Sequence, residues 1–264
     1  MNALRNVGAI VEKEWRHYFG SPIAYVALFV WSALFGGFFY LVFDRFLMVS
    51  QRAMQQMEFG GGGPKLSLNE WVISQVLHNM SVVALFLAPM LTMRLFAEET
   101  RHGTLELLAT SPLTDLQVVL GKFLGALGVY LLMIVVGFVN FLPLWYYATA
   151  PPEWKPVLSG GLALLLVGAS FIAMGLFMST LTRNQIVAGS LTFGLLLVLW
   201  IVGWMDDPMA GPVAKAIAYL GLMNHVEDMM KGIIDLKDVV FYLSVTGFGL
   251  FLALQSVESQ RWRA

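Results

Sequence analysis

Long uncharged apolar segments alternate with short polar segments along most of this chain. A helix crosses a bilayer with roughly 20 apolar residues, and six segments reach that length. The predicted spans are residues 22–43, 76–93, 118–147, 157–181, 186–205 and 239–257. The pattern therefore predicts an all-α integral membrane protein in which residues 1–264 form one transmembrane domain.

The two longest polar segments, 44–70 and 206–238, each connect an odd-numbered span to the next and so fall on the same side of the membrane. We predict both to be outside loops. Apolar residues recur at helical steps in the second, which indicates a helix near 212–232.

The first 20 residues are predicted to form an amphipathic interface helix. Its apolar residues recur at steps of three and four, and they are Leu4, Val7, Val11, Trp15 and Tyr18. Charged residues occupy the opposite side, and Trp and Tyr suit a bilayer surface. One interpretation is simple anchoring, and the other adds contact with a cytosolic partner.

A charged segment, residues 97–115, interrupts the apolar pattern between the second and third spans. Glu98 to His102 is polar and compatible with a helix, and Gly103 breaks it. Thr104 is a suitable cap for a second short helix over 105–109. An ordinary loop is the alternative, but a helical insert outside the bilayer suits a membrane protein that is driven by a soluble motor.

Turn and cap residues delimit the rest of this segment. Ser111 precedes Pro112 and so avoids helical geometry, which ends the short helix. Thr114 and Gln117 match a capping box that opens the third span. Further along that span, Gly121 and Gly125 permit close approach of another helix.

Composition supports the membrane class and excludes others. Hydrophobic residues make up 58% and charged residues 12% of the chain, against about 25% charged in a soluble domain. The net charge of −1 gives no reason to expect nucleic acid as a partner. The chain has no cysteine, and its four histidines lack metal-binding spacing. His225 with Asp228 is interpreted as part of a solvated helix, so no metal site is predicted.

Six spans leave both termini on one side. Nine of the 16 Lys and Arg residues would be inside if the termini are cytoplasmic, and these lie close to span ends. The first apolar run lacks a convincing cleavage site and is expected to remain as an anchor. We therefore predict a multi-pass protein of a bacterial inner membrane with cytoplasmic termini.

Several segments together resemble one family. Residues 98–111, with Glu-Glu, Arg, Gly-Thr-Leu-Glu-Leu-Leu and Thr-Ser-Pro, are similar to the coupling region of type-2 ABC exporter permeases. Residues 12–25 resemble the opening of its gliding-motility-associated and copper-enzyme-maturation branch. Residues 182–185 and 225–239 resemble corresponding parts of that branch, so the resemblance extends over essentially the whole chain.

This resemblance implies a permease with six spans, an interface helix and a cytosolic coupling helix that docks on an ABC ATPase subunit. Such permeases form dimers with themselves or with a related permease, and some occur with a membrane subunit bearing a large extracytoplasmic domain. The implied ATPase-contacting residues are Glu98, Glu99, Arg101, Gly103, Thr104, Glu106 and Leu107. The second cytosolic loop, with Arg183, Asn184 and Gln185, either touches the same partner or is a plain tight turn.

The chain contains no G-x-x-x-x-G-K-[ST] segment. We therefore expect this chain to bind no cofactor and to be no enzyme, with ATP and Mg²⁺ held by the partner ATPase and membrane lipid around the spans.

Two other functions fit a polytopic chain less well. An ion-coupled transporter or channel usually needs ionisable groups at membrane depth, which the cores of the predicted spans lack. A membrane-embedded enzyme needs an ordered set of catalytic groups. Only scattered candidates such as His78 and Ser81 are present.

Overall fold

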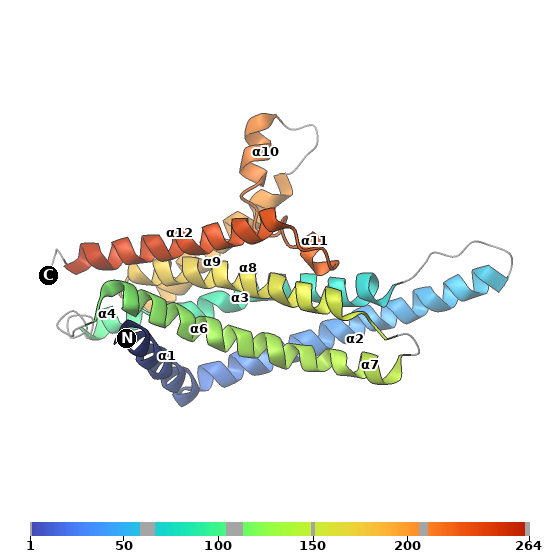
Figure 1. The fold of residues 1–264 in the computed structure, drawn as a ribbon, viewed down its shortest axis with the longest axis horizontal. Helices are drawn as coiled ribbons and strands as arrows, with labels where there is room; N and C mark the ends of the chain where they lie inside the picture. Colours follow the sequence, from blue (N-terminus) through green and yellow to red (C-terminus); the bar gives the residue numbers. More distant parts are fainter. Residues whose placement is uncertain (1, 59–66, 104–112, 149–150, 206–210, 262–264) are drawn as a thin grey trace.

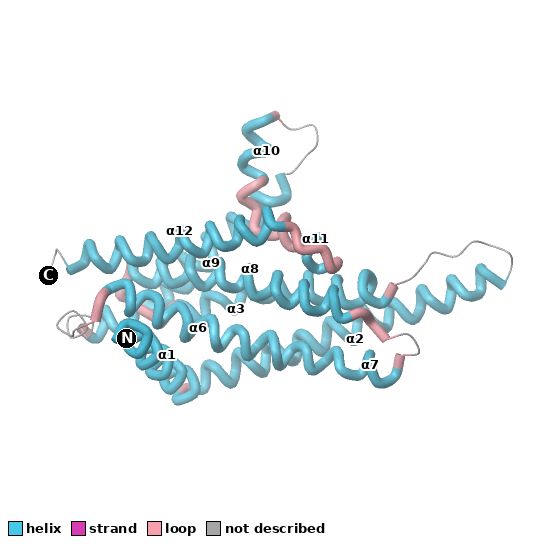
Figure 2. The backbone as a smooth tube through the Cα atoms, viewed as in Figure 1, coloured by secondary structure: helices cyan, strands magenta, loops and turns pink. Residues whose placement is uncertain are grey.

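The computed structural model describes residues 2–58, 67–103, 113–148, 151–205 and 211–261 (Figure 1). Within these ranges the chain is helical and has no strand, and loops join the helices mainly at the two ends of a bundle (Figure 2). The elements are α1 (Asn2–Gly20), α2 (Pro22–Glu58), the π-helical turn η1 (Asn69–Ile73), α3 (Ser74–Thr92), α4 (Ala97–His102), α6 (Asp115–Phe138), η2 (Val139–Phe141), α7 (Leu142–Tyr147), α8 (Trp154–Thr180), α9 (Gln185–Val202), η3 (Gly203–Met205), α10 (Pro212–Ala218), α11 (Glu227–Met230) and α12 (Leu236–Arg261).

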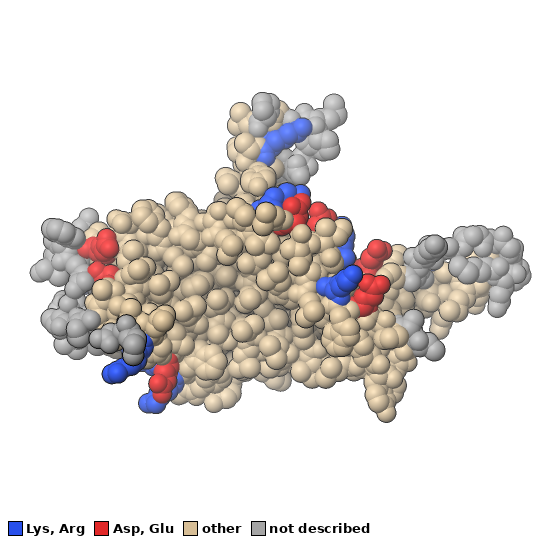
Figure 3. All heavy atoms as spheres, in the orientation of Figure 1, with Lys and Arg blue, Asp and Glu red and all other residues tan. Residues whose placement is uncertain are grey.

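Six helical stretches in these ranges are long and apolar enough to cross a membrane. They are Pro22–Gln56, Asn69–His102, Asp115–Tyr147, Trp154–Thr180, Gln185–Val202 and Leu236–Gln260. The prediction of an all-α membrane fold with six spans is confirmed. Charged side chains gather toward the two ends of the visible face and leave an uncharged band between them (Figure 3). Both termini lie at the end of the bundle that also carries α4 (Figure 1).

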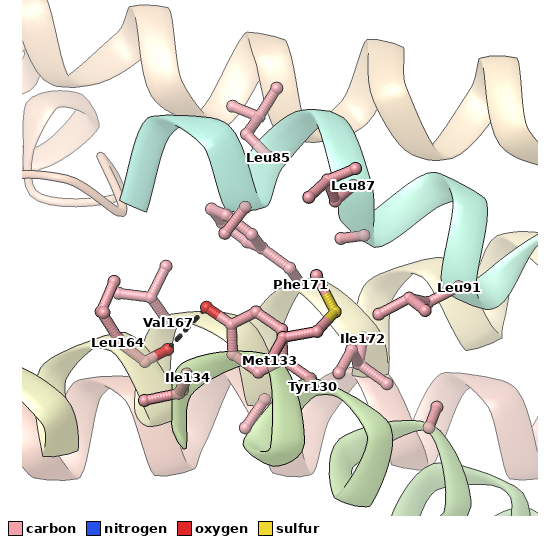
Figure 4. Packing of buried hydrophobic residues seen from close by; sticks show 14 of the residues in the cluster. Leu85, Leu87, Leu91, Tyr130, Met133, Ile134, Leu164, Val167, Phe171 and Ile172 are labelled. Atoms are coloured by element: carbon pink, nitrogen blue, oxygen red, sulfur yellow. Dashed lines mark hydrogen bonds between the residues drawn. The ribbon is translucent and has the colours of Figure 1, made fainter. Parts of the chain in front are cut away.

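Helices α3 and α8 form the centre of the bundle. In their most apolar windows 67% and 72% of residues are buried, against 17% in α2 and in α9. Figure 4 shows Leu85, Leu87 and Leu91 of α3 on one side of a layer of residues from α6 and α8. Helices α2 and α9 therefore leave most of their apolar surface free to face lipid or another protein.

Tyr130 shows how α6 fits against α8. Its hydroxyl donates to the carbonyl oxygen of Leu164 at 3.1 Å, and this bond is drawn in Figure 4. A Cβ atom at Gly168 would lie 1.9 Å from Cε1 of Tyr130. Glycine at 168 therefore makes the space that the buried ring occupies.

The first predicted loop, 44–70, is wrong in its first part, because α2 continues as a helix to Glu58. Residues 44–58 contain neither glycine nor proline, so nothing in the local sequence stops the helix. Ala53, within this extension, is buried. The loss of apolar character after Phe43 marks the end of the apolar run and not the end of the helix.

The single helix predicted near 212–232 is also wrong. Two short helices, α10 and α11, occupy this segment, and turns separate them. At Gly221 the returning chain meets η3 so closely that a Cβ there would lie 2.3 Å from the Cα of Gly203. The chain turns where two glycines allow backbone-to-backbone contact, which helical periodicity alone does not reveal.

Candidate functional site at the junction of α1, α4 and α6

Helix α4 begins where the chain turns away from α3, and a side chain of α8 caps it. The Oγ atom of Ser179 accepts from the backbone N–H groups of Phe96 at 3.0 Å and Ala97 at 3.1 Å. The same hydroxyl donates to the carbonyl oxygen of Met93 at 3.3 Å. Ser179 is fully buried. It therefore supplies partners for backbone groups that the start of a helix leaves unsatisfied, and it ties α4 to the end of α8.

The other end of α4 is a glycine cap. Gly103 has a φ of 68°, and its N–H bonds back to the carbonyl oxygens of Glu99 and Thr100. Left-handed geometry at this position favours glycine. The predicted helix from Glu98 to His102 and its break at Gly103 are both present. Thr104, Glu106 and Leu107, together with the predicted helix over 105–109, lie outside the described residues.

Four charged side chains meet where α1, α4 and α6 come together, and we call Lys13, Glu14, Glu99 and Lys122 the ion cluster. The Nζ atom of Lys122 lies 2.9 Å from Oε1 of Glu14 and 2.9 Å from Oε1 of Glu99. The Nζ atom of Lys13 lies 2.9 Å from the same Glu99 oxygen. Two cations thus balance two carboxylates across three helices.

Lys122 and Glu14 form the inner, buried pair of this cluster, and their burial makes this pair important for stability. The side chains of Lys122 and Glu14 are 2% and 6% exposed. An ion pair taken so far out of water is tolerated only when both partners are present and well oriented. Lys122 also lies over the ring of Phe96, 5.2 Å from its centroid, which adds a cation–π contact.

Lys13 forms the outer edge of the cluster and is more than half exposed. Burial by itself lowers the pKa of its ammonium group, but the bond to Glu99 and the attraction of the Glu99 and Glu14 charges together outweigh that effect and raise the pKa above its ordinary value. Lys13 therefore remains charged and keeps α1 attached to α4.

Close contact between α1 and α6 positions Glu14 for this pairing. Cβ atoms at Gly121 and Gly125 of α6 would lie 2.6 Å from Ile10 and 2.8 Å from Glu14. Trp15 donates from Nε1 to the carbonyl oxygen of Gly125 at 3.1 Å. The predicted close approach at Gly121 and Gly125 is present, and the approaching helix is α1. The Thr114–Gln117 capping box that orients α6 is also present.

The face of α1 that contacts the protein differs from the predicted apolar stripe. Tyr18 is buried, whereas Val7 and Val11 are half-buried. Trp15 is 39% exposed and Leu4 is 85% exposed, so Leu4 takes no part in this packing. The buried face runs through Ile10, Glu14 and Tyr18, at steps of four. A carboxylate in that row was the available signal for a buried cation partner.

A cavity of about 320 Å³ lies beside the cluster, between α1, the α3–α4 turn and α6. Its polar lining includes His17, Arg94, Glu98 and His102. His17 Nε2 lies 3.7 Å from Oε2 of Glu98. Glu98 and Glu99 therefore both face α1, whereas Arg101 and Gly103 are exposed at the tip of α4.

The second predicted cytosolic loop is a short turn with its own cap. Asn184 accepts through Oδ1 from the N–H of Ile186 at 2.9 Å, which starts α9. The hydroxyl of Thr182 accepts from the N–H of Asn184 at 3.2 Å. Arg183 is exposed, and Gln185 is the first residue of α9. Because α4 also contacts α9, this turn lies near the same end of the bundle.

Comparison with known proteins identifies the family to which this chain belongs. A search of curated proteins found no match. The model of the family described as ABC-2 family transporter protein matches residues 8–254, which is most of the chain and contains α4 and the whole ion cluster. This protein therefore belongs to the ABC-2 family of transporter proteins, as a multi-pass membrane permease subunit of an ABC transporter.

Proposed function

We propose that an ABC ATPase subunit docks on the α4 end of this permease and drives it from there. The attachment of α4 to its neighbours carries this proposal. Ser179 joins α4 to α8, and the ion cluster joins it to α6 and α1. A push on α4 would therefore reach two further spans and the interface helix through direct contacts.

The docking surface in this proposal begins with the exposed residues at the tip of α4. Arg101, His102 and Gly103 are all solvent-exposed. Thr104, Glu106 and Leu107 continue it as proposed contacts. Glu98 and Glu99 serve a different purpose in this scheme, because their side chains face α1. They transmit movement to the bundle and do not dock the ATPase.

The mechanism is indirect. ATP and Mg²⁺ bind to a pair of ATPase subunits, and closure of that pair pushes α4. The movement passes through Glu99 and Lys122 to α6, and through Ser179 to α8. Either a substrate is then exported, or the motion is passed to a partner beyond the membrane.

The proposed assembly contains two permeases, either two copies of this chain or one copy with a related permease of the gliding-motility-associated or copper-enzyme-maturation branch. The α4 end and both termini face the cytoplasm of a bacterium, and the spans lie in its inner membrane. The extension of α2 then projects outside, where Leu47, Met48 and Met54 are exposed. This apolar surface supports contact with a membrane subunit that carries an extracytoplasmic domain.

Co-purification in mild detergent tests the docking site. Arg101→Glu should abolish stoichiometric recovery of the ATPase subunit and its ATP hydrolysis. Lys155→Glu is the matched control, because Lys155 is an exposed cation in a different helix, α8, and lies outside the docking surface. Unchanged ATPase recovery with Arg101→Glu, in a variant that folds normally, would rule out docking at this tip.

A second variant separates transmission from docking. Glu99→Gln removes a charge that bridges two lysines while leaving the tip of α4 intact. The ATPase should still co-purify, but the permease should lose its effect on the rate of ATP hydrolysis. Loss of co-purification with Glu99→Gln, at normal permease stability, would assign this residue to docking instead.

A further inference from the structure

A second buried pair of ionisable side chains lies outside the α4 junction, between the α10–α11 segment and the start of α12. His225 and Asp238 are 6% and 2% exposed. Nδ1 of His225 lies 2.7 Å from Oδ1 of Asp238, and Nε2 lies 3.0 Å from the carbonyl oxygen of Tyr219. Both ring nitrogens are therefore engaged, each with a different part of the chain.

The two partners fix how many protons the pair holds. A carbonyl oxygen can only accept, so Nε2 must carry a hydrogen. An ionised Asp238 can also only accept, and then Nδ1 must carry a second hydrogen and the ring is a cation. Alternatively, Asp238 is protonated and donates to Nδ1. In both cases the pair holds one proton more than a neutral imidazole beside a carboxylate.

We infer that His225 and Asp238 form a proton-binding site that fastens residues 219–226 to α12. When that proton leaves, the one remaining hydrogen can satisfy only one of the two contacts. With the hydrogen on Nδ1, the Nε2 lone pair faces the carbonyl oxygen of Tyr219. With the hydrogen on Nε2, the Nδ1 lone pair faces the carboxylate. Rising pH therefore weakens the attachment, because the fastened arrangement binds the additional proton.

Aromatic side chains surround the His225 ring, and only the folded chain brings them together. The His225 ring stacks on Phe241 with centroids 3.9 Å apart. The titratable groups that face it from neighbouring elements are Tyr219 and Tyr242, whose rings lie 4.8 and 6.3 Å away. The hydroxyl of Tyr242 donates to the carbonyl oxygen of Leu222, which adds a second fastening of the same segment to α12.

Charged residues of the adjoining turns are paired among themselves. Lys237, next to Asp238 in sequence, lies 2.9 Å from Asp235 and also feels the charges of Asp238 and Asp228. Lys231 of the α11 end lies 3.6 Å from Glu227. Each of these two cations lies beside a carboxylate. The positions of the protons on His225 are set by its own two hydrogen bonds. The inference does not depend on the proposed function, since it follows from these contacts alone.

Spin labels measure the attachment directly, and the chain has no cysteine of its own to interfere. The labels are placed at Leu220→Cys and Leu243→Cys, which are 54% and 57% exposed. The distance between them is followed in detergent from about pH 5 to about pH 9 by pulsed electron paramagnetic resonance. We expect one narrow distance at low pH and a reversible broadening as the pH rises.

Asp238→Asn is the discriminating variant. Its amide can donate to Nδ1 of a neutral imidazole, so both contacts persist without the additional proton. The distance should then stay narrow over the whole pH range. Asp235→Asn, an exposed carboxylate three residues earlier, is the matched control and should behave like the unaltered pair of labels. A pH-invariant distance in the unaltered chain, or the same broadening in Asp238→Asn, would overturn the inference.

A measurement without the Asp238 substitution covers the case in which that variant does not fold. Selective ¹⁵N labelling of histidine, with His225 assigned through His225→Gln, reports whether each ring nitrogen carries a hydrogen. The ¹⁵N signals of His225 should change over the same pH range as the distance. Signals that stay constant while the distance broadens would refute the site.

Discussion

Replacing Lys122 with methionine should destabilise this protein through the carboxylate that it leaves behind. Lys122→Met keeps most of the side-chain volume but removes the cation 2.9 Å from Glu14, whose side chain is 6% exposed. Breaking a buried ion pair by removing one partner costs about 3–5 kcal/mol. Glu99 is less affected, because it keeps Lys13 at 2.9 Å. We therefore expect the lower part of that range, about 3 kcal/mol.

The assay is thermal unfolding in detergent, followed by the fluorescence of the eight tryptophans. For a chain of this size 1 kcal/mol corresponds to roughly 2–4 °C, so Lys122→Met should lower Tm by roughly 6–12 °C. The double variant Glu14→Met with Lys122→Met removes both buried charges. It should recover most of the loss, because an apolar pair of similar volume is often as stable as a buried ion pair.

Lys155→Met, at an exposed position, is the control and should leave Tm within about 1 °C. A Lys122→Met variant whose Tm falls no more than that of the control, or a double variant as unstable as the single one, would contradict a destabilising unpaired Glu14. A double variant that is stable but no longer responds to the ATPase would separate the proposed transmitting role of the cluster from its structural role.

Three further changes test other contacts. Ser179→Ala leaves two backbone donors of α4 without an acceptor, so we expect a loss of about 1–2 kcal/mol and faster amide exchange over residues 96–100. Gly168→Ala places a Cβ 1.9 Å from a ring atom of Tyr130, so unfolding experiments should show a loss of about 1–3 kcal/mol. The raised pKa of Lys13 means that its contribution is fully present below its ordinary value of 10.5 and is lost as the pH rises through the higher folded-state value. Since this side chain is largely exposed, only a small extra fall in Tm at alkaline pH is expected, and Lys13→Met should lack it.

Matched variants make these results interpretable. Gly194→Ala adds a methyl group where nothing lies within 4 Å, so it should be neutral or stabilising by up to about 1 kcal/mol. Equal losses at Gly168 and Gly194 would contradict the packing argument. Ser244→Ala removes a hydroxyl that donates to the carbonyl oxygen of Val240 in its own helix, away from α4. If it changes α4 exchange as much as Ser179→Ala does, the capping role of Ser179 is wrong.

Local patterns were enough to predict the features that depend on neighbouring residues. Six apolar runs predict six spans because length and composition decide whether a helix can cross a bilayer. The Thr114–Gln117 capping box and the break at Gly103 were predictable for the same reason, since each involves residues within one turn. The end of α2 was not, because a polar composition after Phe43 does not by itself stop a helix.

The partners within the candidate site could not be predicted, because they are far apart in the sequence. Glu14 and Lys122 are 108 residues apart, and Ser179 is 82 residues from Ala97. Nothing in the residues next to each of them in the sequence indicates its distant partner. What the sequence does contain is a carboxylate in the row of Ile10 and Tyr18, which predicts that a buried cation exists but not which one.

The separation of Glu14 from Lys122 also has a consequence for biosynthesis. Helix α1 is synthesised before the α6 surface that receives it, and the lysine that neutralises Glu14 follows 108 residues later. At about 5–20 residues per second, that surface is synthesised roughly 5–20 s after the helix. During that interval Glu14 has to remain hydrated. The docking of α1 is therefore a late step, which can take place only after the first three spans have been inserted.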